Sequence, residues 1–346
     1  KRGWLVCVFA GTARIHHMFC RSLEKDPPAP PATPPSEHAN AIEDLYRRND
    51  ELVGKVMAKL RKGDMLMVIS DHGFTSFRRG VNLNAWLLEH GYLALKEGRD
   101  GSGEWLAAID WSRTRAYAVG LAGMFLNVAG REAQGIVQPG EEAQRLKREL
   151  VERMSGLRDE EKKEVGIREV FDTAKLYAGP YLENAPDLIV GYNHGYRVSW
   201  DCATGMASGP VFEDNTRAWS GDHCVDPRLV PGGFFCSHKT DVAEPALMDL
   251  APTALTLFGL EPPAHMDAKP LFKAGPPPPP LPPGAGATGR LRAGPPPPAS
   301  RSAASPSPLP RSPSWVAASP AGQRSPSNAR SSCLASMAST TRWPSA

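Results

Sequence analysis

Met65-Leu66-Met67-Val68-Ile69-Ser70-Asp71-His72-Gly73-Phe74 joins a short apolar run to a carboxylate, an imidazole and a glycine. An apolar run of this length that ends in polar residues predicts a buried strand. In open α/β sheets, ligands bind just beyond the carboxyl ends of the strands. Asp71 and His72 therefore suit a divalent cation such as zinc, with Gly73 letting the backbone bend. A loop aspartate that caps a turn beside an unrelated histidine fits the spacing equally well.

The segments on either side of this stretch alternate between strand and helix patterns. Trp4 to Phe9 predicts a buried strand, and Ala41 to Leu60 carries apolar residues near helical spacing. With the strand at Met65 to Ile69 they predict a parallel strand–helix–strand unit. Further strands are expected at Asp187 to Gly191 and Gly233 to Cys236, and a closing helix at Ala246 to Phe258. The expected fold class is α/β, a mainly parallel sheet flanked by helices on both faces.

The composition of the chain changes sharply after Lys273. The last 73 residues hold 18 of the 35 prolines and seven arginines, but no lysine and no acidic residue. Such a segment cannot bury enough apolar surface to fold. We therefore expect a folded domain over residues 1–273 and a disordered Pro/Ser/Ala/Arg-rich tail over 274–346. The tail is interpreted either as a polyproline ligand for aromatic-lined grooves or as the product of a shifted reading frame.

Charge and composition limit the classes of function. Without the tail, 33 basic residues face 37 acidic ones, and a mildly acidic body argues against a general nucleic-acid surface. Six cysteines without CxxC spacing indicate ordinary core thiols. The chain begins at Lys1 and has no leader pattern and no apolar run near 18 residues. We therefore expect no signal peptide and no membrane span, and a true N-terminus upstream, which leaves the compartment open.

A second polar stretch, Trp219-Ser220-Gly221-Asp222-His223-Cys224, again places an aspartate beside a histidine after a glycine turn. An isolated pair of this kind is more often surface or core than functional. His223 becomes a candidate ligand only if the fold brings it to Asp71 and His72. In that case Asp222 could orient the His223 ring from behind.

A third stretch, Gly11 to Phe19, follows the first expected strand and contains His16 and His17. Adjacent residues point in different directions, so only one of the two imidazoles is expected to face a site. No carboxylate lies within the four residues before His17. A bare histidine pair is more often structural or exposed than metal-binding.

Taken together and in this order, the three stretches resemble the later metal-binding motifs of the type I phosphodiesterase and nucleotide pyrophosphatase family of the alkaline phosphatase superfamily. Family-like phrases between and after them are Asn82 to Leu87, Gly130-Arg131-Glu132, Ala185 to Tyr192 and Met248 to Thr253. The similarity covers roughly residues 1 to 273. It implies the C-terminal two-thirds of a phosphoesterase domain, with a substrate-side insertion at about 109–185.

The resemblance implies a metal-dependent hydrolase that cleaves a phosphodiester or nucleotide pyrophosphate bond in a small phosphoester or nucleotide substrate. Two divalent cations, zinc or manganese, would share the phosphoester while a Thr or Ser hydroxyl attacks phosphorus. Asp71 and His72 would bind the cation on the nucleophile side. His17 and His223 would bind the cation on the leaving-group side.

Two departures from the family pattern bear on activity. Ala13 stands where the family has an aspartate, four residues before His17, so the leaving-group-side cation loses a carboxylate ligand. In addition, no Ser or Thr in residues 1–273 matches the family's nucleophile motif. The chain as written is therefore expected to be inactive or nearly so.

Two other functions stay open at this point. One is a phosphomonoesterase or a cofactor-independent phosphomutase, which shares the two-cation core of the superfamily. The other is a degenerate module that binds phosphate esters without hydrolysing them, which Ala13 favours. Arg131 and Arg197 could contact a substrate phosphate, although structural ion pairs are the commoner role of such residues.

Ala13→Asp is expected to tighten cation binding at His17, because it returns an anionic oxygen ligand. Loss of groups that only support a metal ligand typically costs ~10 to 100-fold in affinity, so the gain should be at least in this range. Calorimetric titration of A13D and of the unsubstituted chain with zinc measures this gain in affinity. Superimposable isotherms for A13D and the unsubstituted chain would contradict the expectation.

Overall fold

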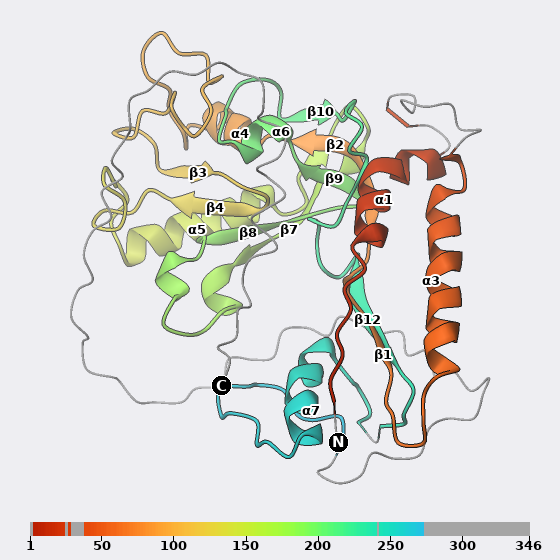
Figure 1. Cartoon of the computed structure of the whole chain (residues 1–346). Helices are drawn as coiled ribbons and strands as arrows, with labels where there is room; N and C mark the ends of the chain where they lie inside the picture. Colours follow the sequence, from red (N-terminus) through yellow and green to blue (C-terminus); the bar gives the residue numbers. More distant parts are fainter. Residues whose placement is uncertain (1–2, 25–26, 29–37, 241, 273–346) are drawn as a thin grey trace, which may run out of the picture. The chain divides into compact units, whose positions relative to one another are not determined.

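The computed structural model describes residues 3–24, 27–28, 38–240 and 242–272 (Figure 1). Every described residue falls within one compact unit of the chain. The expected tail over 274–346 lies outside the described residues. No helix in the described ranges is long and apolar enough to cross a membrane.

The α/β fold class is confirmed by the order of the elements. The helices are α1 (Gly11–Phe19), η1 (Cys20–Leu23), α3 (Ala41–Met57), α4 (Leu83–Glu89), α5 (Glu141–Met154), η2 (Thr173–Lys175), η3 (Leu182–Asn184), α6 (Trp200–Ala203), η4 (Leu247–Asp249) and α7 (Leu250–Leu257). The strands are β1 (Met67–His72), β2 (Thr75–Val81), β3 (Ala116–Ala118), β4 (Gly123–Leu126), β5 (Arg158–Asp159), β6 (Glu164–Val165), β7 (Ile167–Asp172), β8 (Leu188–Tyr192), β9 (Gly195–Val198), β10 (Phe212–Asp214), β11 (Gly221–Asp222) and β12 (Pro231–Cys236).

The pairing of the strands differs from the mainly parallel sheet expected from the sequence. β1 pairs with β12, β2 pairs with β9, β10 and β11, β5 pairs with β6, and one sheet has the order β3-β4-β8-β7. Among the named strands of the described residues, only β2 and β9 run parallel. All other pairs are antiparallel. The parallel arrangement is therefore a correction, although the α/β class holds.

The segment from Trp4 to Phe9 accounts for much of this difference. It was expected as a buried strand, but it has no regular secondary structure and Leu5 is 88% exposed. Since this segment does not pair with β1, the strand–helix–strand unit with α3 does not form. β1 instead pairs in antiparallel register with β12, placing Met67 opposite Cys236. An apolar run indicates that a segment is hydrophobic, but it does not indicate whether a neighbouring strand is available to pair with it.

The other expected elements are present with small shifts. α3 confirms the helix expected after residue 41, α7 with η4 confirms the closing helix, and β8 and β12 confirm the two later strands. β1 begins two residues later than expected and extends to His72. Asp71 and His72 are therefore its last two residues rather than the start of the following loop.

A hydrophobic core holds β2 and β9 in place. Its fully buried side chains come from α4, α5, β4 and β8, including Leu87, Leu146, Met124 and Tyr192. By contrast, α1 contains no buried residue and packs beside α3 (Figure 1). The position of α1, which carries His17, therefore depends on specific contacts rather than on a buried apolar face.

The cysteines within the described residues are free thiols. Cys20 and Cys202 are buried, and burial raises the pKa of Cys20 to about 12 and that of Cys202 to about 11. These two fit the expectation of neutral core thiols. Cys7 is exposed and does not fit it, while Cys333 lies outside the described residues.

The free energy of unfolding is expected to fall as the pH drops from about 7 to 5. His238 is buried, its Nε2 has no hydrogen-bond partner among the described residues, and burial lowers its pKa. Burial also lowers the pKa of His17 and of His223. Because the unfolded chain then binds protons more readily than the folded one, stability is present above the ordinary histidine pKa and is lost below it.

Thermal denaturation between pH 5 and pH 8 measures this loss. His238→Gln should make the pH dependence shallower, because it removes the buried imidazole. A melting temperature that stays constant or rises toward pH 5 would contradict the expectation.

Candidate metal centre

The ring of Phe74 is the meeting point of the three histidines expected as ligands. The ring centroids of His17, His72 and His223 lie 4.8, 5.7 and 5.2 Å from that of Phe74. His17 comes from α1, His72 from the end of β1, and His223 from the residue after β11. Three segments that are distant in the sequence therefore converge at one place in the fold.

The rings of His72 and His223 are stacked, with centroids 3.7 Å apart and planes only 15° from parallel. A metal ion binds an imidazole nitrogen along a lone pair in the ring plane, at about 2 Å. Two nearly parallel planes do not meet within that reach. One cation therefore cannot bind both rings in plane, whereas two neighbouring cations can. The His17 ring is tilted by 52° to that of His223, at 5.4 Å.

Backbone carbonyls fix the orientation of two of the three imidazoles. Nδ1 of His17 lies 2.7 Å from the Gly221 carbonyl oxygen, and Nδ1 of His72 lies 2.9 Å from that of Gly73. Because a carbonyl only accepts, each Nδ1 is the donor, and the lone pair of the neutral ring is on Nε2. Metal-binding histidines in proteins are held in this way.

Burial also favours the neutral, metal-binding form of two rings. Desolvation lowers the pKa of His17, although Gly221 and Asp222 act in the opposite direction. Desolvation and the neighbouring His72 lower the pKa of His223. The His223 ring makes no hydrogen bond to another described residue. Half-buried neutral imidazoles with available nitrogens are donors that suit zinc.

Asp71 lies beside His72 and is open to solvent. Its Oδ2 is 3.7 Å from Nε2 of His72, and its side chain is 88% exposed. In a tetrahedral zinc site with bonds of ~2 Å, neighbouring donor atoms lie roughly 3.3 Å apart. The carboxylate and the imidazole can therefore reach the same ion with a small rotation of Asp71.

Asp222 acts on the backbone rather than on the His223 ring, which corrects the expectation. Its Oδ1 accepts hydrogen bonds from the amides of His223 and Cys224, at 2.8 and 3.2 Å. Its Oδ2 accepts from Arg197 Nε at 2.7 Å and from Trp219 Nε1 at 3.0 Å. Burial raises the pKa of Asp222, but these donors more than offset it, so the pKa is lower than usual.

Asp222, His223 and Cys224 also bring three donor atoms within 4.8 Å of one another. This trio is nevertheless a poor cation site. Both oxygens of Asp222 are occupied, and burial raises the pKa of Cys224 to about 12. A neutral thiol is a weak metal ligand, since the thiolate is the species that binds.

The two arginines considered as phosphate contacts are engaged in ion pairs within the protein. Arg197 is buried against Asp222. Arg131 pairs with Asp187 at 2.6 Å and with Glu132 at 2.8 Å. Both therefore have the structural role that was the commoner alternative.

Two further aromatic side chains contact the cluster. The His16 ring stacks on Phe74 at 4.9 Å, while its Nδ1 bonds the Thr12 carbonyl. Among the described residues no ring contact joins His16 to the three candidate ligands, so the expectation that one of the adjacent histidines faces the site stays a prediction. Trp219 stacks on His17 at 3.8 Å. Its place directly before the Ser-Gly-Asp-His run was the only available signal.

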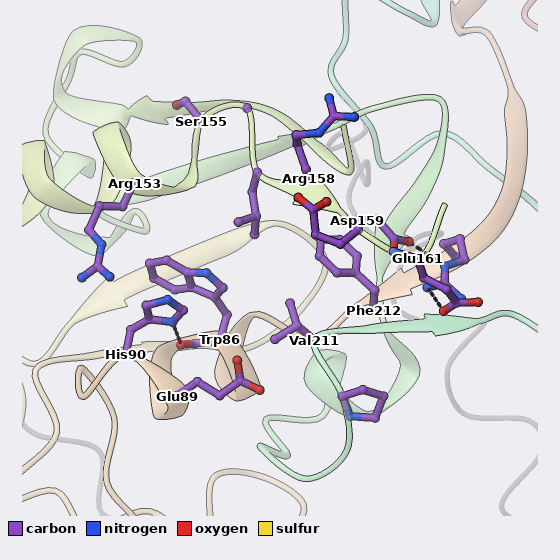
Figure 2. Close-up of a pocket in the computed structure, with 15 residues that line it drawn as sticks. Trp86, Glu89, His90, Arg153, Ser155, Arg158, Asp159, Glu161, Val211 and Phe212 are labelled. Carbon is purple, nitrogen blue, oxygen red and sulfur yellow. Dashed lines mark hydrogen bonds and ion pairs between the residues drawn. The ribbon is translucent and has the colours of Figure 1, made fainter. Parts of the chain in front are cut away.

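A separate groove of about 700 Å³ (Figure 2) is lined by none of these three histidines. Trp86 and His90 stack along one side of it, and Arg153 comes from α5. Arg79 in its wall is bound by the carboxylates of Asp159, Glu161 and Asp214, each at 2.8 Å. The groove shares no lining residue with the histidine cluster, and its charged groups are largely paired.

The family model for type I phosphodiesterase / nucleotide pyrophosphatase matches residues 3–215, which is more than half of the chain. The chain belongs to this family. Membership places it among hydrolases of the phosphodiesterase and pyrophosphatase type, in the alkaline phosphatase superfamily. The matched region contains His17, Asp71 and His72 and ends before His223. No curated protein and no solved structure matches the chain.

Gly221→Ala is expected to move α1 away from the 219–224 loop and to lower the free energy of unfolding by ~1 to 3 kcal/mol. Gly221 lies so close to α1 that an added Cβ would come within 2.6 Å of Cys20 Sγ and would also meet the His16 carbonyl. Gly233→Ala is the matched control, because its Cβ would meet nothing within 4 Å. Urea unfolding of both variants measures the difference, and equal stabilities would contradict the close packing.

Proposed function

We propose that this chain supplies the imidazole ligands of a two-cation phosphoesterase centre for phosphodiester or nucleotide pyrophosphate bonds. We further propose that the chain as given does not turn over substrate. The observation that carries the proposal is the convergence of His17, His72 and His223 around Phe74. The family membership supports the reaction class.

The proposed division of ligands is the one that the resemblance to the family implies, and the ring geometry is compatible with it. His72 and Asp71 would hold one cation, because their donor atoms are 3.7 Å apart. His223 would hold a second cation together with His17, because its plane is nearly parallel to that of His72. Paired metal ions in phosphoryl-transfer sites typically lie ~3.5 to 4 Å apart. Two stacked imidazoles at 3.7 Å suit that spacing.

When bound, such cations neutralise the non-bridging phosphoryl oxygens and lower the pKa of an attacking oxygen. Several residues of this chain would orient the ligands for that role. Backbone carbonyls keep Nε2 of His17 and of His72 available. Phe74 contacts the rings of His17, His72 and His223. Asp222 fixes the backbone from which His223 projects.

The proposed lack of turnover is supported by the groups near the cluster. Ser70 donates its hydroxyl to the His72 carbonyl at 2.7 Å, and Ser220 donates to the Met18 carbonyl at 3.3 Å. Both hydroxyls are therefore occupied rather than presented as nucleophiles. Ala13, one helical turn before His17, offers no carboxylate to the second cation.

Zinc binding should depend on the three histidines separately. His72→Gln is expected to weaken one cation, and His17→Gln or His223→Gln the other, because each change removes a direct ligand. Calorimetric titration resolves the two affinities, and His90→Gln, which lies outside the cluster, is the matched control. Identical isotherms for the three variants and the control would contradict the proposed centre.

Hydrolysis of p-nitrophenyl phosphate and bis-p-nitrophenyl phosphate, with zinc or manganese added, tests the lack of turnover. The rate is expected to stay at the metal-only background. Robust turnover that requires both protein and metal would refute it. Preference for the monoester would then favour a phosphomonoesterase, and preference for the diester a phosphodiesterase.

A phosphate-ester-binding module without catalysis is a second candidate, favoured by Ala13. Equilibrium dialysis with a nucleoside monophosphate separates it from a merely incomplete enzyme. Tight binding without hydrolysis would support the module.

A further inference from the structure

The anchoring of His17 is unusual for a residue that must hold a fixed direction. The helix that carries it, α1, has no buried residue of its own. Most helices in proteins are stabilised by packing an apolar face, whereas α1 packs beside α3 without a fully buried side chain. Apart from the edge-on contact with Phe74, the direction of the His17 ring depends on its contacts with residues 219–221.

Three contacts tie His17 to this segment. The Ser220 amide donates to the His17 carbonyl at 2.6 Å, and the His17 ring bonds the Gly221 carbonyl at 2.7 Å. The third contact is the indole of Trp219, whose ring centroid lies 3.8 Å from that of His17 at 29° between planes. The carbonyl bond fixes one ring atom, whereas the indole fixes the plane of the ring.

Trp219 is itself linked to the strands that border the hydrophobic core. Its Nε1 donates to Asp222, which is bound by Arg197 of β9. The Arg197 guanidinium lies 4.5 Å from the ring centroids of both Phe77 and Trp200. Because β9 pairs with β2 along the hydrophobic core, the indole is connected to the rigid part of the fold.

We propose that Trp219 is a positioning residue for the His17/His223 cation. Its indole, oriented by the bond to Asp222, holds the His17 ring in the plane that directs Nε2 toward the second cation. The proposal rests on the proposed two-cation function. It predicts that loss of the indole weakens the His17/His223 cation and leaves the Asp71/His72 cation unchanged. Asp71 and His72 lie on β1 and not on the segments that the indole contacts.

The test uses two substitutions of Trp219 in the full chain, titrated with zinc and with cobalt. Trp219→Leu removes both the stacked ring and the N–H donor, and it should weaken the second cation by ~10 to 100-fold, the range for groups that support a metal ligand. Trp219→Phe keeps a flat ring but loses the donor, and it should cause a smaller loss at the same cation. In both variants the affinity of the Asp71/His72 cation should stay unchanged.

Trp111→Leu is the matched control, since Trp111 is also half-buried and contacts Tyr117 edge-on outside the cluster. It should leave both affinities unchanged. A loss at both cations in the Trp219 variants would indicate general destabilisation and would overturn the selective role. Unchanged affinities in both variants, with His17→Gln still weakening one cation, would overturn the inference and leave the proposed function standing. No effect of His17→Gln would instead overturn the proposed function.

A second measurement keeps the inference falsifiable if Trp219→Leu does not fold. Cobalt bound at His17 should quench the emission of an indole that stacks on that ligand. The quenching should be reduced in Trp219→Phe, where the nearby Trp200 remains, lost in His17→Gln and kept in Trp111→Leu. Quenching that is as strong in Trp219→Phe as in the unsubstituted chain, or that is absent from the unsubstituted chain when both cations are bound, would contradict the contact.

Discussion

The buried ion pair between Asp222 and Arg197 is the interaction on which the site depends. Both side chains are about 5% exposed, and an ion pair at this depth is stable only when its remaining donors and acceptors are also satisfied. Asp222 meets this condition by accepting from two amides and an indole as well as from Arg197. The carboxylate thereby fixes the backbone of His223 and the ring of Trp219 at the same time.

This ion pair lies between two parts of the fold that differ in burial. On one side, β2 and β9 are continuous with the hydrophobic core. On the other side, α1 has no buried residue, and β12 is the one strand that pairs with β1 among the described residues. The cluster around Phe74 lies where these parts meet, so its geometry depends on the close approach of α1 to Gly221. A glycine is required there because α1 occupies the space of a side chain.

Family membership and site geometry contribute different information about function. The match over residues 3–215 gives the reaction class, whereas the roles of individual residues have to be argued from the site itself. The tautomers of His17 and His72, the parallel rings at 3.7 Å and the exposed Asp71 all suit a pair of cations. The resemblance implies an aspartate where this chain has Ala13, and this difference is one of the two on which the proposed lack of turnover rests.

The sequence by itself determined the α/β fold class, the helix that begins at Ala41, and the three motifs that carry the candidate ligands, and its resemblance to the family gave the reaction class. Local patterns were sufficient for the helix and the motifs, because periodicity and side-chain chemistry are properties of neighbouring residues. Tertiary structure alone decided the partner of β1, the exposure of Trp4 to Phe9, and the contacts of Asp222 and Trp219. These features depend on residues that are far apart in the chain, such as Met67 opposite Cys236. A local pattern does not specify which distant strand or side chain will pack against a given residue.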